Sequence, residues 1–346
     1  MLKKLKYIAY ASLFVMTITA SAVVSIFSAL NTELENALSL SYVRQRAEIV
    51  DGKTLNAAIK DTTYATANTT VTSIIFDDYS ATADGYYRYI VDGVNLIEGT
   101  EPVSVASDGT DSINMFRVEN SDETVSVYIL SDAQICATGN MTYCFYNLTG
   151  LETLLFNNFD VSGVTNMFGF FQNCSSLTAL DLSMFYTTSL TSCQVLFSGC
   201  TSLETLDISN FDTSKVINMS SMFNGCKALK GVLDLTHFNT ENVTTFYCAF
   251  QNCNNVTEFV LTSFNTSSAT IMNNMFAYCS SITTLDLTSF DTRYATDMHS
   301  MFYGAKSLET IKVGSNWDED SKTINGDTRN VSTMYTNCPA GGVTVV

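Results

Sequence analysis

Apolar residues recur in fixed columns along most of the second half of the chain. The clearest column is cysteine, at Cys174, Cys200, Cys226, Cys253 and Cys279, with intervals of 26, 26, 27 and 26 residues. Leucine and other aliphatic columns keep the same phase, as does a phenylalanine column that runs through Phe185, Phe211 and Phe238. Several columns that stay in phase over six repeats are typical of a chain built from stacked repeats.

Each repeat divides into three phrases. The phrase L-x-x-L-x-L, as in residues 177–182, is the strand phrase of a leucine-rich repeat. The phrase FDTS at residues 211–214 predicts a turn, because Asp, Ser and Thr side chains bond to nearby backbone. In residues 219–226, apolar side chains at i, i+3, i+4 and i+7 predict one face of a short helix.

These phrases predict an α/β solenoid of the leucine-rich-repeat kind. Its parallel β-sheet would form one face and its short helices the other, with strands about 4.8 Å apart. We expect the solenoid over residues 136–338, with a degenerate C-terminal repeat, and an N-terminal β cap over residues 71–135.

The N-terminus has the pattern of an export signal. Three lysines precede a stretch without charge from Tyr7 to Thr32, which contains the small-residue sequence Ala20-Ser21-Ala22. Residues 1–30 therefore predict a signal peptide or, if uncleaved, a transmembrane anchor formed by an N-terminal hydrophobic helix over residues 7–30. Residues 31–70 are expected to form a helical stalk, a linker or a short packing helix.

Charge and composition narrow the classes of function. The formal net charge is −17, and no Lys or Arg occurs between Arg117 and Lys215. Because nucleic-acid binding needs clustered cations, that class is disfavoured. The chain has only two histidines and no C-x-x-C pair, so we expect no enzyme activity, no cofactor and no metal site.

The sulfur-rich segment 219–226 raises one metal hypothesis, since Met and Cys are ligands for Cu(I). The same columns, however, exchange Met or Cys for Leu, Phe or Ala in other repeats, which packing tolerates and ligation does not. We therefore expect core packing and mostly free, buried thiols. The turn residues are likewise expected to be structural caps, and they are Asp160, Asp212, Asn239, Asn265 and Asp291.

The candidate binding site is a column of aspartates between buried strand positions. Alternation along a strand should point these side chains outward, onto the concave face of the sheet. Stacked carboxylates there could be relieved by Ca²⁺, by a basic partner or by water and salt. The candidate residues are Asp181, Asp207, Asp234 and Asp286, with Thr205, Thr284, Ser183 and Ser209 beside them.

Two segments carry a family resemblance: LDISNFDTSKVINMSSMFNGCKALKG and LDLTSFDTRYATDMHSMFYGAKSLET. They resemble the BspA-type leucine-rich repeat of bacterial surface proteins, and the resemblance covers roughly residues 71–338. It implies an exported protein at the bacterial cell surface that binds an extracellular protein, from host matrix or another cell, in adhesion. The alternative is a structural or self-associating cell-envelope scaffold. Tyr186 departs from the family pattern at the turn aspartate.

Overall fold

The computed structural model describes residues 46–60, 70–78, 80–81, 87–91, 94–97, 102–110, 112–324 and 326–346. The chain divides into residues 1–45 and residues 46–346, so every described residue belongs to the second unit. The predicted N-terminal hydrophobic helix lies outside the described residues. Within the part of the chain that is described, no helix has the length and apolar character needed to cross a membrane.

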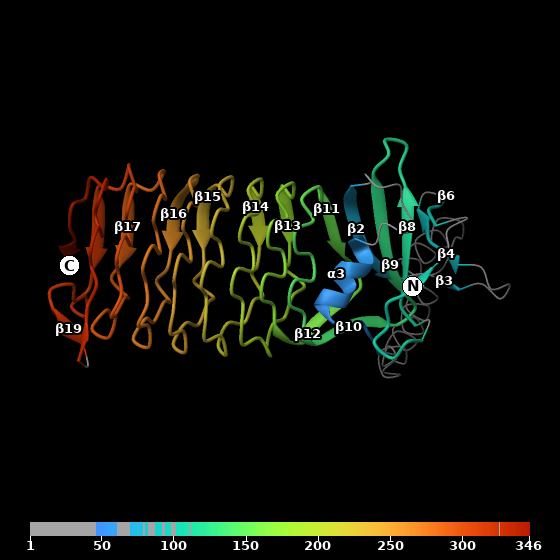
Figure 1. The fold of residues 1–346 in the computed structure, drawn as a ribbon, viewed down its shortest axis with the longest axis horizontal. Coiled ribbons are helices and arrows are strands. Elements are labelled where there is room, and N and C mark those ends of the chain that lie inside the picture. The colour runs from blue at the N-terminus through green and yellow to red at the C-terminus, as the bar shows by residue number, and fades with distance from the viewer. Residues whose placement is uncertain are drawn as a thin grey trace, which may run out of the picture. The chain divides into compact units, whose positions relative to one another are not determined.

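Helix α3 (Gly52–Lys60) is the single helix of the described residues, which otherwise form short strands and turns (Figure 1). The strands are β1 (Arg46–Glu48), β2 (Val71–Asp78), β3 (Ser80–Ala81), β4 (Tyr87–Arg88), β5 (Ile90–Val91), β6 (Val94–Asn95), β7 (Val103–Ser104), β8 (Asn114–Glu119), β9 (Val125–Ser131), β10 (Gln134–Asn140), β11 (Thr153–Phe156), β12 (Phe159–Asn166), β13 (Ala179–Asp181), β14 (Thr205–Asp207), β15 (Gly231–Asp234), β16 (Val256–Val260), β17 (Thr284–Leu287), β18 (Thr310–Val313), β19 (Thr323–Ile324), β20 (Asp327–Thr328) and β21 (Thr344–Val345).

Helix α3 begins at a side-chain cap. The Asp51 carboxylate accepts hydrogen bonds from the backbone N–H groups of Lys53 and Thr54, at 3.0 and 3.2 Å. The helix buries Leu55 and Ile59 in the main core. Within the predicted 31–70 segment, these nine residues therefore form a packing helix.

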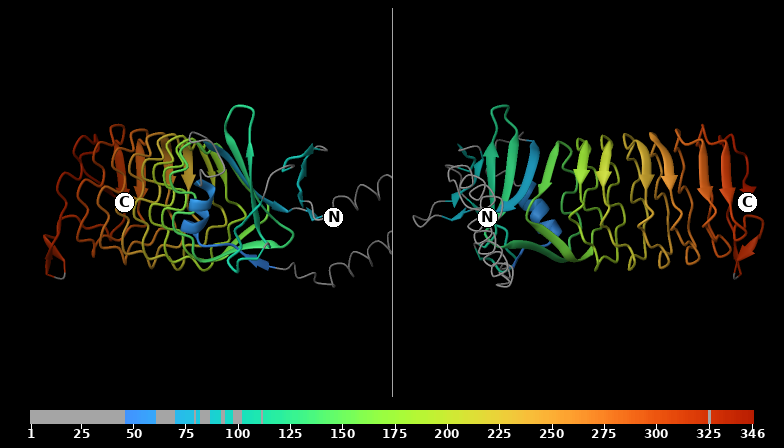
Figure 2. Two further views of the ribbon diagram at one scale, coloured as in Figure 1. Left: turned by 45° about the vertical axis from the view of Figure 1, so that its right-hand side comes forward. Right: turned by 180° about the vertical axis from the view of Figure 1, so that it is seen from behind.

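A five-stranded sheet with the order β11-β2-β9-β8-β7 precedes the regular repeats. Strand β2 pairs in parallel with both β9 and β11, whereas β8 pairs with β9 in antiparallel fashion. Strand β11 belongs to the first repeat, so the repeat region adds directly to this sheet. Figure 2 shows the later strands following along the same side of the unit.

The prediction of an α/β solenoid with a helical layer is wrong. The described residues contain no repeat helices, and the repeat strands fall into several separate sheets. These sheets are β13-β14, β15-β16 and β17-β18-β21. The repeat that contains β15 is 27 residues long, and its one extra residue lies near Gly231. Gly231 has a φ of 78°, and the β15–β16 register shifts there. A bulge of this kind locally interrupts strand pairing.

The predicted helices are absent because their segments form successive tight turns. In residues 219–226, the N–H groups of Met222, Asn224 and Cys226 donate to the carbonyl three residues earlier, not four. The alternate N–H groups donate to the next repeat, as Ser221 does to Tyr247 at 2.7 Å. Ser221 and Gly225 have φ values of 55° and 79°, which a right-handed helix excludes.

Residues 141–338 repeat this backbone arrangement. Pairs of left-handed residues four apart recur in every repeat, from Tyr143 and Asn147 to Thr333 and Asn337. One parallel bridge also joins each repeat to the next, through Asn166, Ser192, Asn218, Thr245, Ile271, Asp297 and Asn330. The side chains at i, i+3, i+4 and i+7 are still buried, as at Met219, Met222, Phe223 and Cys226, because the turn geometry repeats every four residues.

The core of the repeats consists of ladders in which each residue contacts its counterpart one repeat away. Phe197 and Phe223 stack at 5.5 Å between ring centroids, and Phe223 and Phe250 at 5.6 Å. Buried threonines form a second ladder: the Thr240 hydroxyl donates to the Asn265 carbonyl at 3.0 Å and accepts from its N–H at 2.8 Å. Such paired bonds satisfy backbone groups that burial would otherwise leave unbonded.

Candidate binding face

The exposed side chains of the repeat strands form a surface that we call the strand face, defined by β13 to β18. Asp181, Asp207 and Asp234 are the last residues of β13, β14 and β15, and Asp286 is next to last in β17. All four aspartates are exposed, as expected from strand alternation. Of their predicted neighbours, Thr205, Thr284 and Ser209 are exposed and Ser183 is partly buried.

The strand register brings only part of the predicted column together. Asp181 lies directly opposite Asp207 in the β13–β14 pair, and Thr205 lies opposite Ala179. Asp286 instead lies opposite Lys312, and Asp234 lies opposite Val260. The column is therefore one carboxylate pair and two single carboxylates, divided among three sheets.

Each aspartate also accepts a hydrogen bond, at or near the end of its strand, from the backbone N–H two residues further along the chain. The Asp181 carboxylate accepts from the Ser183 N–H at 2.9 Å, and the Asp207 carboxylate accepts from the Ser209 N–H at 3.0 Å. Asp234 and Asp286 accept in the same way from Thr236 and Thr288. The sequence reasoning missed this role, although the recurrent D-x-S and D-x-T spacing is the signal for an Asx turn.

These bonds keep the strand face negatively charged. The hydrogen bond from Ser183 lowers the pKa of the Asp181 carboxyl below its ordinary value. The bonds from Thr236 lower the pKa of Asp234, and those from Thr288, with a smaller effect of Lys312, lower the pKa of Asp286. Hydrogen bonds to a carboxylate favour its charged form, so these groups stay ionised at neutral pH.

Cations are few on this surface. The strands β13 to β18 hold five carboxylates and one ammonium group, which is that of Lys312. Lys230, which immediately precedes β15, forms an ion pair with Glu204. Among the described residues, no group of three or more His, Cys, Asp or Glu side chains is placed to hold a metal ion. The strand face is thus a carboxylate and hydroxyl surface. Its acidic residues are Asp181, Asp207, Asp234, Glu258 and Asp286.

The turn residues act as caps, which confirms that expectation. Asp212 accepts from the Ser214 N–H at 2.9 Å, and Asn239 and Asn265 accept from the residue two positions on at 3.1 Å. Asp160 and Asp291 make the same bond, at 2.9 and 3.1 Å. Asn serves this purpose as well as Asp, because the bond requires only a side-chain oxygen.

The sulfur columns belong to the core, as predicted. All ten cysteines are free and buried. The thiol of Cys226 lies 3.2 Å from the carbonyl oxygen of Phe197 in the preceding repeat, and that of Cys200 lies 3.1 Å from the carbonyl oxygen of Phe171. Burial raises the pKa of Cys200 to about 12. A thiol held in its protonated form is a poor nucleophile and a poor metal ligand.

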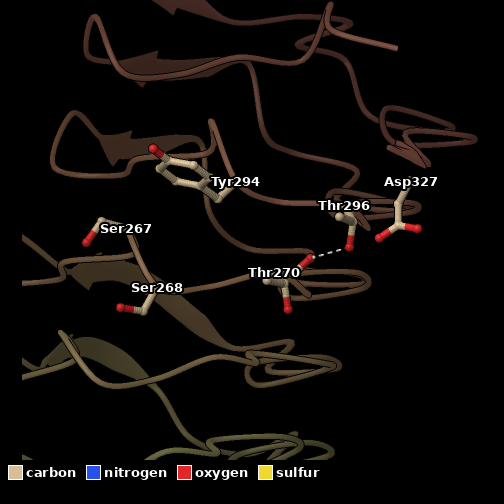
Figure 3. A pocket seen from close by; sticks show the side chains of 6 residues that line it. All are labelled: Ser267, Ser268, Thr270, Tyr294, Thr296 and Asp327. Carbon is tan, nitrogen blue, oxygen red and sulfur yellow. Dashed lines mark hydrogen bonds between the residues drawn. The ribbon is translucent and has the colours of Figure 1, made fainter. Parts of the chain in front are cut away.

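The structure also has a shallow pocket beside Tyr294 that the sequence analysis did not identify (Figure 3). The only sequence signal was an aromatic residue in a column where the four preceding repeats have serine, lysine, asparagine and serine.

Comparison with known proteins returns one family. The model of the family described as "Mycoplasma protein of unknown function, DUF285" matches residues 113–234 and 230–339. No curated protein and no solved structure matches the chain. The two matched segments together span the repeats and strands β8 to β10, which directly precede them.

Proposed function

The chain belongs to the DUF285 family of Mycoplasma proteins of unknown function, and we propose that it is an exported surface protein whose strand face binds a basic region of another protein, in adhesion to host or other cells. The observation that carries this proposal is the set of five exposed carboxylates on β13 to β18, strands that hold a single ammonium group, that of Lys312. We propose binding because exposed carboxylates can attract a positively charged surface of a partner.

Electrostatics supports a partner with exposed Lys or Arg. Asp181, Asp234 and Asp286 have lowered pKa values, so their negative charge persists well below neutral pH. Complementary charge across an interface speeds association and selects partners. Because these side chains are exposed to solvent, their attraction to a partner should weaken as ionic strength rises.

Export is supported by the sequence of residues 1–30. Lysines at positions 3, 4 and 6 are followed by a stretch without charge and by Ala20-Ser21-Ala22. This order of positive, apolar and small residues is typical of a secretory signal, and without cleavage the same segment would serve as an anchor. Either outcome would place the repeats outside the cytoplasm.

The test is binding of the full-length chain to immobilised purified matrix proteins, measured at low and at raised salt. The informative variant is D181N/D207N/D234N. Asn keeps a side-chain oxygen for the turn bond while removing the charge, whereas Ala would remove both. We expect wild-type binding that weakens with salt and a Kd at least about tenfold higher for the triple variant, which corresponds to about 1.4 kcal/mol.

The matched control is D212N, which removes one carboxylate at a turn position where other repeats have Asn239 and Asn265. It should bind like wild type. Equal binding by wild type and the triple variant would reject the strand face as the contact surface. Light scattering addresses the scaffold alternative: association of the wild-type chain with itself, in the absence of any matrix protein, would favour that alternative.

A further inference from the structure

A second surface, the Tyr294 pocket, differs from the strand face in both location and chemistry. It is open to solvent and has a volume of about 530 Å³. Its lining residues come from two neighbouring repeats and from the β19–β20 hairpin. They are Ser267, Ser268, Thr270, Tyr294, Thr296 and Asp327.

The side chains divide the pocket into an aromatic end and an acidic end. Figure 3 shows the Tyr294 ring at one end with Ser267 and Ser268 near it, and the Asp327 carboxylate at the other end. Thr270 and Thr296 lie between them. The Thr296 hydroxyl donates to the Thr270 carbonyl at 3.1 Å, which leaves its oxygen lone pairs able to accept a further bond.

Tyr294 lacks a hydrogen bond that three of the four preceding repeats make at the same position. At this position the Lys215, Asn242 and Ser268 side chains each donate a hydrogen bond to a carbonyl of the preceding repeat, at 2.8, 2.8 and 2.7 Å. Among the described residues, Tyr294 makes no such bond, and its side chain is 51% exposed. Departures from a local structural pattern that bring no evident gain in stability are expected at functional positions.

The side chains that line the pocket limit the chemical classes of ligand that it could bind. Four hydroxyl side chains and one carboxylate surround a single aromatic ring. No Lys or Arg is among the described residues that line the pocket, so a phosphate group would find no cation there. The described lining has no aliphatic side chain either, so an apolar protein segment would find no matching surface. A sugar has both an apolar C–H face and many hydroxyls.

We propose that the Tyr294 pocket binds a neutral saccharide of at least two rings. One ring stacks its C–H face on Tyr294, whose aromatic face provides apolar area at low conformational cost. The sugar hydroxyls then bond to Ser267, Thr270 and Thr296, and the Asp327 carboxylate accepts from a pair of hydroxyls at the far end. This site is independent of the protein contact proposed for the strand face.

The test is saturation-transfer NMR of the full-length chain with a panel of neutral sugars: the methyl glycosides of glucose, galactose and mannose, together with lactose, cellobiose and chitobiose. The key variant is Tyr294→Ser, because Ser268 already occupies the same position one repeat earlier. We expect wild type to bind at least one disaccharide more tightly than any monosaccharide. Tyr294→Ser should raise its Kd about tenfold or more.

Matched variants separate recognition from folding. Tyr294→Phe keeps the ring and should retain binding within about twofold. Tyr186→Ser removes a tyrosine of similar exposure, 53%, outside the pocket and should bind like wild type. Asp327→Asn should weaken binding by about threefold or more, because a charged acceptor forms the stronger bond. The proposal is overturned if no sugar of the panel binds wild type, or if Tyr294→Ser binds as tightly as wild type.

Discussion

At the scale of single residues, the aspartates of this protein have two roles at once. Asp207 ends a strand by accepting a bond from Ser209, and it also contributes charge to the strand face. Asp212 makes the same kind of bond in a turn at which other repeats use Asn. The turn role requires only an oxygen, whereas the surface role requires a charge. Asp-to-Asn exchange therefore separates the two functions.

This dual role predicts an acid-sensitive fold. Hydrogen bonds lower the pKa values of Asp181, Asp212, Asp234 and Asp286 from an ordinary value of 3.8. A carboxyl group with a lowered folded-state pKa contributes stability that is present above the unfolded-state pKa and is lost as pH falls through the folded-state value. Melting temperature, followed by circular dichroism, should therefore be nearly flat from pH 7 to 5 and should fall below about pH 4.

The control for this prediction is the variant D181N/D212N/D234N/D286N. It keeps the acceptor oxygens but does not titrate, so its melting temperature should fall less steeply below about pH 4. An acid decline as steep as that of wild type would show that other groups cause the sensitivity.

At the scale of elements, one hydrophobic pattern fits two backbone conformations. Inward residues at i, i+3, i+4 and i+7 match a helix, and they equally match turns that repeat every four residues, as in 219–226. The deciding features are the left-handed positions, held by Ser221 and Gly225 in this repeat. The turns also direct alternate N–H groups to the next repeat, whereas a helix would retain those bonds within itself.

The two conformations predict opposite effects for Gly225→Ala. In a helix, Ala would stabilise by about 1 kcal/mol relative to Gly. At a φ of 79°, Ala should instead destabilise by about 1–2 kcal/mol, although a Cβ there meets no atom closer than 3.6 Å. Urea unfolding of the full-length chain measures the sign directly.

Gly225→Asn is the matched control for that measurement. The same position holds Asn147, Asn173 and Asn252 in other repeats, each with a positive φ. Asn tolerates this conformation better than Ala, so its cost should be the smaller of the two. A stabilising Gly225→Ala would contradict the turn geometry.

At the scale of the whole described unit, stability comes mostly from contacts between residues about one repeat apart. The Phe171–Phe197 stack, at 5.5 Å, joins equivalent positions 26 residues apart, and the bonds of buried Thr187 to Asp212 span 25. Because each repeat presents nearly the same groups on both sides, one complete repeat can be removed without leaving unmatched surfaces.

This regularity predicts that a deletion is tolerated when it removes a whole repeat, even if a shorter deletion that removes part of a repeat is not. Removal of residues 175–200, one whole repeat, should leave a chain that still unfolds in a single cooperative transition. Removal of only residues 175–187 takes away half a repeat, so residues on either side of the deletion no longer meet their equivalents in the neighbouring repeat. This deletion should abolish the transition. Thermal unfolding by circular dichroism compares the two. Loss of cooperative unfolding in the longer deletion alone would contradict this repeat register.

Much of the core and part of the candidate site were predictable from sequence. Cys226 and Phe223 recur in columns whose cysteines and phenylalanines are buried in the other repeats as well, so repetition replaces an alignment as a signal. The exposure of Asp207 followed from strand alternation. The division of the repeat strands into several sheets was not predictable, because it depends on which backbone groups of neighbouring repeats pair.

By itself, the sequence determined the repeat length, the inward residues, the turn caps and the outward aspartates, because all of these follow from local spacing. Only the tertiary structure decided that residues 219–226 turn instead of coiling into a helix, since their N–H groups find partners such as Tyr247 in the next repeat. It also decided which outward residues meet. Asp181 faces Asp207 while Asp286 faces Lys312, and Tyr294 shares a pocket with Asp327, because register and hairpin placement depend on backbone distant in sequence.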